Sequence, residues 1–191
     1  MRDTFNDYMT AEIDGDFVVF LTGMRLNRWW KIWKWLPVFI AMPRMNRELA
    51  ANPELGMLHY RYYPGIRSMM VIQYWSSVEK LLAYATDKTR AHLPAWRRMN
   101  KTVGVNGDVG TWHETYIIRR ADYECLYVNM PQFGLAKAAR HVSARGAQRT
   151  AKARLGQKGS TWAGLDIPPA KGDTEAPGAE LPENDQAPQA S

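Results

Sequence analysis

The strongest constraint on the fold of this chain is the order in which two hydrophobic periodicities alternate between residues 14 and 135. Runs rich in β-branched and aromatic residues predict five strands, at residues 16–26, 55–63, 68–75, 109–118 and 123–130. Apolar residues at helical spacing predict three helical segments, at residues 28–51, 76–86 and 93–103. Strands and helices are therefore interleaved, which favours an α+β fold.

The order β-α-β-β-α-β, followed by one short extra strand, is that of a ferredoxin-like fold. That fold has an antiparallel sheet with its helices on one face. Pro64 and Gly65 mark the turn of the central hairpin, and Ser76 and Glu79 have the spacing of a capping box at the next helix. The hairpin strands are apolar on both faces, so we expect a second subunit to cover the open face.

The net charge of +6 is concentrated in one short segment. Residues 136–160 carry seven basic side chains and no acid, whereas residues 161–191 carry six acids and one lysine. We divide the chain into a flexible N-terminus (1–13), a ferredoxin-like domain (14–135), a basic and partly helical extension (136–160) and a disordered tail rich in Pro, Ala and acids (161–191). The extension is interpreted as solvated rather than as a nucleic-acid or membrane site, and we predict no specific nucleic-acid partner.

Composition excludes several classes of protein. Cys125 is the single cysteine, which excludes a disulfide scaffold and suits a reducing cytoplasm. The longest apolar run, residues 35–42, is too short to span a membrane, and the acidic N-terminus is not typical of a secretory signal. The four histidines have no recognisable metal spacing, and neither a dinucleotide fingerprint nor a P-loop occurs, so we predict no metal site.

Several strings resemble a known family. The segment from Gly65 to Trp96 is similar to the core of the antibiotic-biosynthesis monooxygenase superfamily, which typically has strand, aromatic, Ser, helix and then His. Trp75, Ser76 and His92 occupy those places. The strings AMPRM (residues 41–45) and GTWHETY (residues 110–116) resemble a narrower monooxygenase-like branch that includes a fumagillin-pathway member.

This resemblance implies a dimeric α/β barrel in which two sheets pack face to face. It implies a pocket between each sheet and its own helices. It also implies oxidation of an aromatic or polyketide-like small molecule by O₂, often without metal or flavin, although relatives of the same fold hold haem. One fold hosts many chemistries, so the reaction remains a hypothesis.

Strand alternation divides residues 109–118 between two faces. Trp112, Glu114 and Tyr116 share one face, and we expect that face to line the pocket. A carboxylate among apolar groups has a raised pKa and serves as an acid or base, which makes Glu114 a candidate catalytic residue. The alternative for Glu114 is a structural ion pair with Arg25 or Arg61.

His92 is the second candidate catalytic residue, because a loop histidine between two helices has access to a pocket mouth. There it would deprotonate a substrate hydroxyl, or in a haem protein it would ligate iron. The alternative is a capping or surface histidine. Trp75 and Trp96 are expected to flank it as substrate-binding residues, whereas His113 is interpreted as an interface histidine.

Trp29, Trp30, Trp33 and Trp35 fall within seven residues. The favoured interpretation is an aromatic stripe that packs on the sheet, with Trp33 contributing to substrate binding. A surface helix that contacts a membrane is a less favoured alternative, because Arg and Lys are interleaved with the tryptophans.

The leading hypothesis is a homodimeric, cofactor-independent monooxygenase that oxidises a hydrophobic or aromatic metabolite with O₂, a reaction typical of secondary metabolism. The alternatives are a haem-binding enzyme of the same fold, which degrades haem or dehydrates a substrate, and a non-catalytic ligand-binding or membrane-surface protein. The oxygenase hypothesis requires an aromatic-lined hollow between the sheet and its helices.

Overall fold

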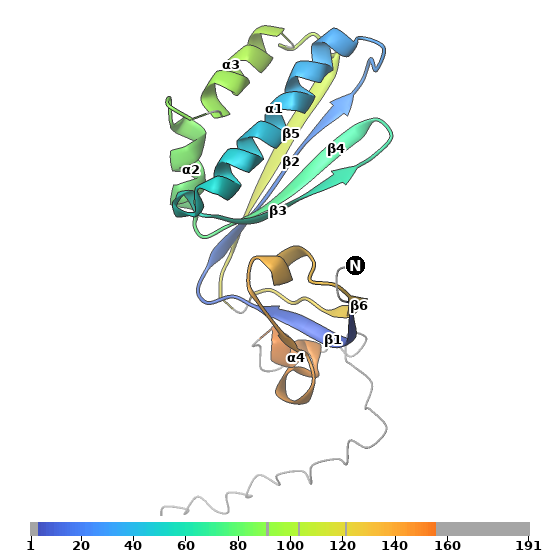
Figure 1. The fold of residues 1–191 in the computed structure, drawn as a ribbon, viewed down its shortest axis with the longest axis vertical. Helices are drawn as coiled ribbons and strands as arrows, with labels where there is room; N and C mark the ends of the chain where they lie inside the picture. The colour runs from blue at the N-terminus through green and yellow to red at the C-terminus, as the bar shows by residue number, and fades with distance from the viewer. Residues whose placement is uncertain (1–3, 91, 103, 121, 156–191) are drawn as a thin grey trace, which may run out of the picture.

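The computed structural model describes residues 4–90, 92–102, 104–120 and 122–155. These residues form two antiparallel sheets, one above the other in Figure 1. The main sheet has four strands in the order β3-β4-β2-β5, and the small sheet has three in the order β6-β1-β7. The tail predicted at residues 161–191 lies outside the described residues.

The elements have the following bounds. The strands are β1 (Phe5–Glu12), β2 (Phe17–Leu26), β3 (Met57–Pro64), β4 (Ser68–Trp75), β5 (Val109–Ile118), β6 (Tyr127–Met130) and β7 (Arg140–Ser143). The α-helices are α1 (Ile32–Ala51), α2 (Val78–Thr86), α3 (His92–Thr102) and α4 (Ala151–Arg154). Three short 3₁₀ turns are η1 (Pro53–Leu55), η2 (Gly134–Lys137) and η3 (Gly146–Gln148).

The main sheet confirms the predicted ferredoxin-like order. β2, α1, β3, β4, the α2–α3 pair and β5 follow one another as β-α-β-β-α-β, and each neighbouring pair of strands is antiparallel. The three helices lie on one side of this sheet (Figure 1). No helix among the described residues is long and apolar enough to cross a membrane.

The core of the main domain lies between the helices and the half of this sheet that is lower in Figure 1. Val18, Leu49, Trp75 and Leu81 are each at least nine-tenths buried there, and Tyr84 joins them. The α2 helix begins with Ser77, whose hydroxyl accepts a hydrogen bond from the Lys80 amide at 3.3 Å. The N-cap is therefore one residue later than the expected Ser76.

A chain of polar side chains crosses this core. The Trp75 indole donates to Gln73 at 3.0 Å, and Gln73 donates to Asn46 at 2.7 Å. Asn46 in turn donates to the Tyr62 hydroxyl at 2.7 Å. Because every buried member has a partner, the chain fixes the position of α1 over β3 and β4 at little cost in desolvation.

The small sheet corrects two expectations about the ends of the domain. Residues 1–13 were expected to be flexible, but Phe5–Glu12 forms β1, the central strand of this sheet. Residues 136–160 were expected to be a partly helical extension outside the domain; α4 and η3 do lie in this range, but Arg140–Ser143 also forms β7 against β1. Both segments are short and polar enough to read as loops, and they become strands because each supplies the other with backbone partners.

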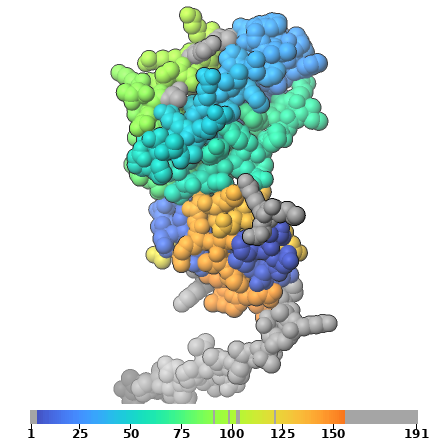
Figure 2. Space-filling model, in the orientation of Figure 1, coloured from blue at the N-terminus to red at the C-terminus, as the bar shows by residue number. Residues whose placement is uncertain are grey.

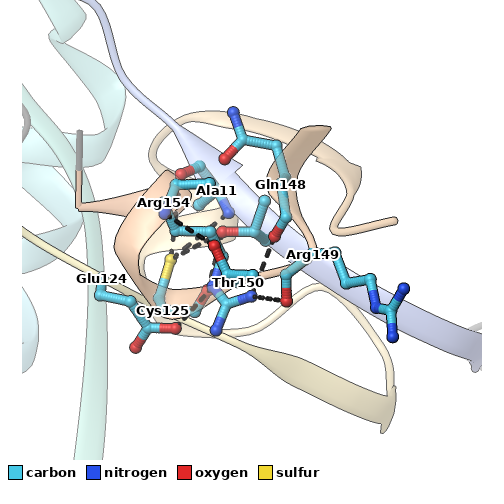
Figure 3. A network of polar contacts seen from close by, with 9 residues as sticks. Ala11, Glu124, Cys125, Gln148, Arg149, Thr150 and Arg154 are labelled. Carbon is cyan, nitrogen blue, oxygen red and sulfur yellow. Dashed lines mark hydrogen bonds and ion pairs between the residues drawn. The ribbon is translucent and has the colours of Figure 1, made fainter. Parts of the chain in front are cut away.

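A network around Arg154 ties α4 to the segment that precedes β6 (Figure 3). The Arg154 side chain is 2% exposed and donates to the Glu124 carboxylate at 2.6 Å. It also donates to the backbone carbonyls of Gln148 and Arg149. Nearby, the Thr10 hydroxyl donates to the Cys125 carbonyl at 2.7 Å. Arg154, one of the basic residues in the range 136–160, therefore has a structural role.

The small sheet also covers part of the face of the main sheet that points away from the helices. Phe17 and Tyr74 on this face pack against Leu135 and Ala136 of η2. Beside them, the Arg61 guanidinium lies 4.1 Å from the centroid of the Phe133 ring. We expected a second subunit to cover this face, and the chain itself covers its lower part.

Candidate functional site

The pairing of β5 with β2 decides which way its side chains point. Tyr116 lies opposite Val19 and Glu114 lies opposite Leu21. Val19 packs toward the small sheet, whereas its neighbour Val18 packs under the helices. Because paired residues point to the same side of a sheet, Tyr116 and Glu114 point away from the helices, and so does Trp112.

The expectation that these three residues face the helices is therefore wrong. Alternation along a strand groups the side chains correctly, but the register with β2 selects the face. We call Trp112, Glu114 and Tyr116 the open-face cluster. Thr111, His113 and Thr115 point to the helix side, and we call them the helix-side strip.

The open-face cluster contains a short hydrogen bond. The Tyr116 hydroxyl donates to the Glu114 carboxylate at 2.6 Å, which raises the pKa of Tyr116. Among the ion pairs of the described residues, none joins Glu114 to Arg25 or Arg61. Glu114 is thus held by a phenol on its own strand, a pairing that the two-residue spacing allowed but that we did not predict.

The helix-side strip is exposed although it faces the helical layer. Thr111, His113 and Thr115 are all exposed, so the helices leave this side of β5 uncovered. The His113 ring lies 5.7 Å from that of Phe20 on the neighbouring strand. His113 is therefore accessible on the helix side of the protomer, whereas we had expected it to be packed at an interface.

His92 is the first residue of α3, and its ring has a defined orientation. Its Nδ1 lies 3.0 Å from the Ala85 carbonyl oxygen. A carbonyl only accepts, so Nδ1 carries the proton and, in the neutral ring, Nε2 keeps its lone pair. The carbonyl at the end of α2 thus makes Nε2 the basic nitrogen.

The residues around His92 are aromatic and acidic. Its ring centroid lies 5.9 Å from that of Tyr84, whose hydroxyl donates to Glu48 at 3.0 Å. Burial and, to a smaller extent, the Glu48 carboxylate raise the pKa of Tyr84. Arg90 approaches the same carboxylate at 3.8 Å. We did not predict the contributions of Tyr84 and Glu48, because no local spacing in the sequence joins α1 to α2.

The predicted tryptophans occupy three different environments. Trp75 is 1% exposed and packed in the core, so it does not border an open space. Trp33 is 65% exposed on α1. Trp96 is 50% exposed and lies one turn after His92 and one turn before Met99, which packs against Met24. Only Trp96 therefore lies near His92 with an exposed surface, on the side of α3 that faces the sheet.

Two hollows of the described chain lie elsewhere than in the space between sheet and helices where we expected one. One hollow, of about 320 Å³, lies on the outer surface of α1 and is bordered by Phe39, Ile40, Pro43, Arg44 and Arg47. The other, of about 150 Å³, lies between η1 and α2 and is bordered by Glu54, Leu55, Lys80, Ala83, Tyr84 and Asp87. Under α2 the space is filled by core side chains, Trp75 and Leu81 among them.

The described residues contain no group of three or more His, Cys, Asp or Glu side chains that is arranged to hold a metal ion. His92 and Glu114 lie on opposite sides of the main sheet, so they do not belong to one site within a protomer.

The fold places the protein among α+β proteins with a ferredoxin-like antiparallel sheet. The family described as monooxygenase af470-like matches residues 17–135, which include the whole main sheet and its three helices. The chain belongs to this family, and the membership indicates a monooxygenase-type function. No curated protein matches the chain.

Three solved structures are similar to part of the chain. SnoaB, a cofactor-independent oxygenase from Streptomyces nogalater, is 13% identical, with a TM-score of 0.40 over 55% of this chain and 95% of its own. A conserved protein of unknown function and possible oxidoreductase from Bacteroides thetaiotaomicron is 11% identical, with a TM-score of 0.37 over 54% and 98%. A dimeric ferredoxin-like protein of unknown function from Jannaschia is 18% identical, with a TM-score of 0.37 over 51% and 97%.

Proposed function

We propose that this protein is a small-molecule monooxygenase that oxidises a hydrophobic or aromatic metabolite with O₂, without metal or flavin. The family match over residues 17–135 supports the reaction class. The observation that carries the site is the hydrogen bond from His92 to the Ala85 carbonyl, because it leaves a basic nitrogen on an oriented imidazole.

In this proposal His92 removes a proton from an acidic substrate group, and the resulting carbanion or phenolate reduces O₂ directly. Conversion of a CH₂ group to a carbonyl balances with one O₂, since one oxygen atom enters the product and the other leaves as water. The chain then needs no external reductant. Its contribution is to position the substrate and to accept the proton, a contribution typically worth 10²–10⁴ in rate.

Core side chains fill the space under α2 where we expected a hollow, so we place the substrate instead against the uncovered helix-side strip, with Trp96 and His113 as its aromatic neighbours. Three features support this location: the uncovered strip, the half-exposed Trp96 and the position of both on the side of the sheet that carries His92. Trp75 then supports the site from the core through its contact with Tyr84, at 6.1 Å between ring centroids.

We further propose that the protein is a cytoplasmic homodimer whose partner covers the open-face cluster. Trp112 and Tyr116 remain 38% and 48% exposed in the protomer, on the same face of the main sheet that packs in part against η2. In the dimer Glu114 would stabilise this interface through Tyr116 rather than act as the catalytic base. Trp112→Glu should convert the dimer to a monomer in sedimentation experiments, and an unchanged sedimentation coefficient would contradict this assignment.

The test of the catalytic proposal is O₂ uptake by purified protein with a panel of polycyclic phenols, in the presence of a chelator and without added flavin. His92→Asn retains an amide donor for the Ala85 carbonyl but has no basic nitrogen, so turnover should fall by about 10²–10⁴ while ligand binding is retained. His59→Gln, on β3 and on the opposite side of the sheet, is the matched control and should retain activity.

Full turnover in His92→Asn would remove the proposed base. An absorbance spectrum of the same preparation tests the alternative that the protein is a haem-binding enzyme. A Soret band would indicate that the protein binds haem, and it would contradict the cofactor-free proposal.

A further inference from the structure

The outer surface of α1 has the wrong polarity for a solvated helix. Its first three turns present five large apolar side chains to the outside, all at least 38% exposed: Ile32, Trp33, Leu36, Phe39 and Ile40. We call these residues the outer face of α1. Surface helices normally carry polar residues on this side, so the pattern indicates a surface that contacts an apolar partner.

Two further tryptophans extend the outer face beyond the start of the helix. Trp29 and Trp30 are 61% and 56% exposed on the turn that precedes α1. Trp35 points inward and donates from its indole nitrogen to the Trp29 carbonyl at 2.8 Å. We had favoured an aromatic stripe packed on the sheet, but of these four tryptophans only Trp35 joins the cluster around Met24.

The turn that carries these tryptophans is held in place. Asp108, whose side chain is 4% exposed, forms ion pairs with Arg28 and Lys31, each at 2.9 Å. Its backbone carbonyl also accepts from the amides of Asn27 and Arg28. The exposed indoles are therefore presented by a fixed turn, which lowers the entropy cost of binding through them.

The C-terminal half of the same surface is basic. Arg44 and Arg47 border an open hollow of about 320 Å³ whose other lining residues are Phe39, Ile40 and Pro43. Neither arginine has an ion-pair partner among the described acids, and residues 27–47 contain no acid at all. Two guanidinium groups beside an apolar floor match a phosphate group joined to a hydrocarbon chain.

We propose that the outer face of α1, with Trp29 and Trp30, binds to the surface of a bilayer that contains anionic phospholipids. The apolar side chains would enter the boundary between headgroups and acyl chains, and Arg44 and Arg47 would bind phosphates. In Figure 2 the blue-to-cyan atoms of α1 form a diagonal band across the front of the upper part of the molecule, where no other described element covers them.

Two other occupants fit this surface less well. Residues 161–191 carry six acids but only four large apolar side chains (Trp162, Leu165, Ile167 and Leu181), too few to cover the outer face. A second copy of this surface would bring the basic groups of both chains together without an acid to neutralise them, because residues 27–47 contain no acid and Glu48 of α1 is bound to Tyr84 and Arg90. An anionic bilayer supplies both the apolar phase and the negative charge.

The test is co-sedimentation of the full chain with phosphatidylcholine vesicles that contain 0 or about 30% phosphatidylglycerol. Binding should require the anionic lipid and should weaken as salt is added. The double substitution Trp33→Ser and Phe39→Ser should weaken binding at least tenfold. Arg44→Gln and Arg47→Gln should each weaken binding to the anionic vesicles about fivefold.

The matched control is Ile66→Ser with Leu82→Ser, which removes two exposed apolar side chains from other surfaces and should leave binding unchanged. Circular dichroism and thermal unfolding of all variants verify that they are folded. Absence of vesicle binding by the natural chain, or equal binding by Trp33→Ser/Phe39→Ser, would overturn the proposal. Loss of self-association in that variant without vesicle binding would assign the outer face to a second copy and would likewise overturn it.

Discussion

Replacement of Arg154 by Met tests how much the buried ion pair between Arg154 and Glu124 contributes to the free energy of unfolding. The Arg154 side chain is 2% exposed, the Glu124 side chain is 18% exposed, and their charged groups are 2.6 Å apart. Removing one partner of a fully buried pair costs about 3–5 kcal/mol, because the other charge is left without compensation. Glu124 keeps some contact with water, so we expect Arg154→Met to lower the free energy of unfolding by about 2–4 kcal/mol.

The matched control has the same geometry at the surface. Arg145 lies 2.6 Å from Asp7, but the two side chains are 44% and 38% exposed. Exposed pairs contribute about 0–1 kcal/mol, so Arg145→Ala should have a much smaller effect. Urea unfolding at one fixed protein concentration measures both values, and the fixed concentration removes any contribution from self-association.

A double variant separates the ion pair from simple packing. In Arg154→Met with Glu124→Gln neither charge is left unpaired, so the loss should be smaller than the sum of the two single losses by about 1–3 kcal/mol. Equal losses in the Arg154 and Arg145 variants, or strictly additive losses in the double variant, would show that burial does not strengthen the Arg154–Glu124 pair.

Three further predictions concern other parts of the fold. Burial lowers the pKa of His141 below its ordinary 6.5, so the unfolded chain binds a proton at a higher pH than the folded chain does. The free energy of unfolding should therefore fall as the pH drops below about 6.5. Urea unfolding measured from pH 7 to 5 should show a smaller decline for His141→Phe. A Cβ on Gly23 would lie 2.7 Å from a backbone oxygen and from the Trp112 indole, so Gly23→Ala should cost about 1–3 kcal/mol and should change the Trp112 fluorescence; an unchanged spectrum would contradict this contact. Gln73→Leu leaves the Trp75 indole without its acceptor and should cost about 2–4 kcal/mol in thermal unfolding, whereas a neutral effect would mean that water replaces the amide.

Much of the main domain was predictable because its signals are local. The strand predicted at residues 109–118 has the observed bounds of β5, and the expected hairpin turn joins β3, which ends at Pro64, to β4. Apolar side chains that recur with a period of two indicate strands, and those that recur with a period of about 3.6 indicate helices. The order of these elements then indicates the ferredoxin-like sheet.

The candidate site was less predictable because its geometry depends on contacts between distant segments. The spacing of Trp112, Glu114 and Tyr116 showed that they share a face, but only the pairing with β2 showed that this face points away from His92. The basic nitrogen of His92 likewise depends on the Ala85 carbonyl, a backbone group that carries no sequence signal.

The sequence by itself determined the kinds of element, their order and the family, because these follow from side-chain periodicity and from strings such as GTWHETY. Tertiary structure decided that Phe5–Glu12 is a strand, that Trp75 is buried and that Trp33 is exposed. A short polar segment becomes a strand only when partners reach it, and an apolar stripe on a helix faces the core only if the sheet beneath it has room. Both outcomes depend on packing between segments that are far apart in the chain.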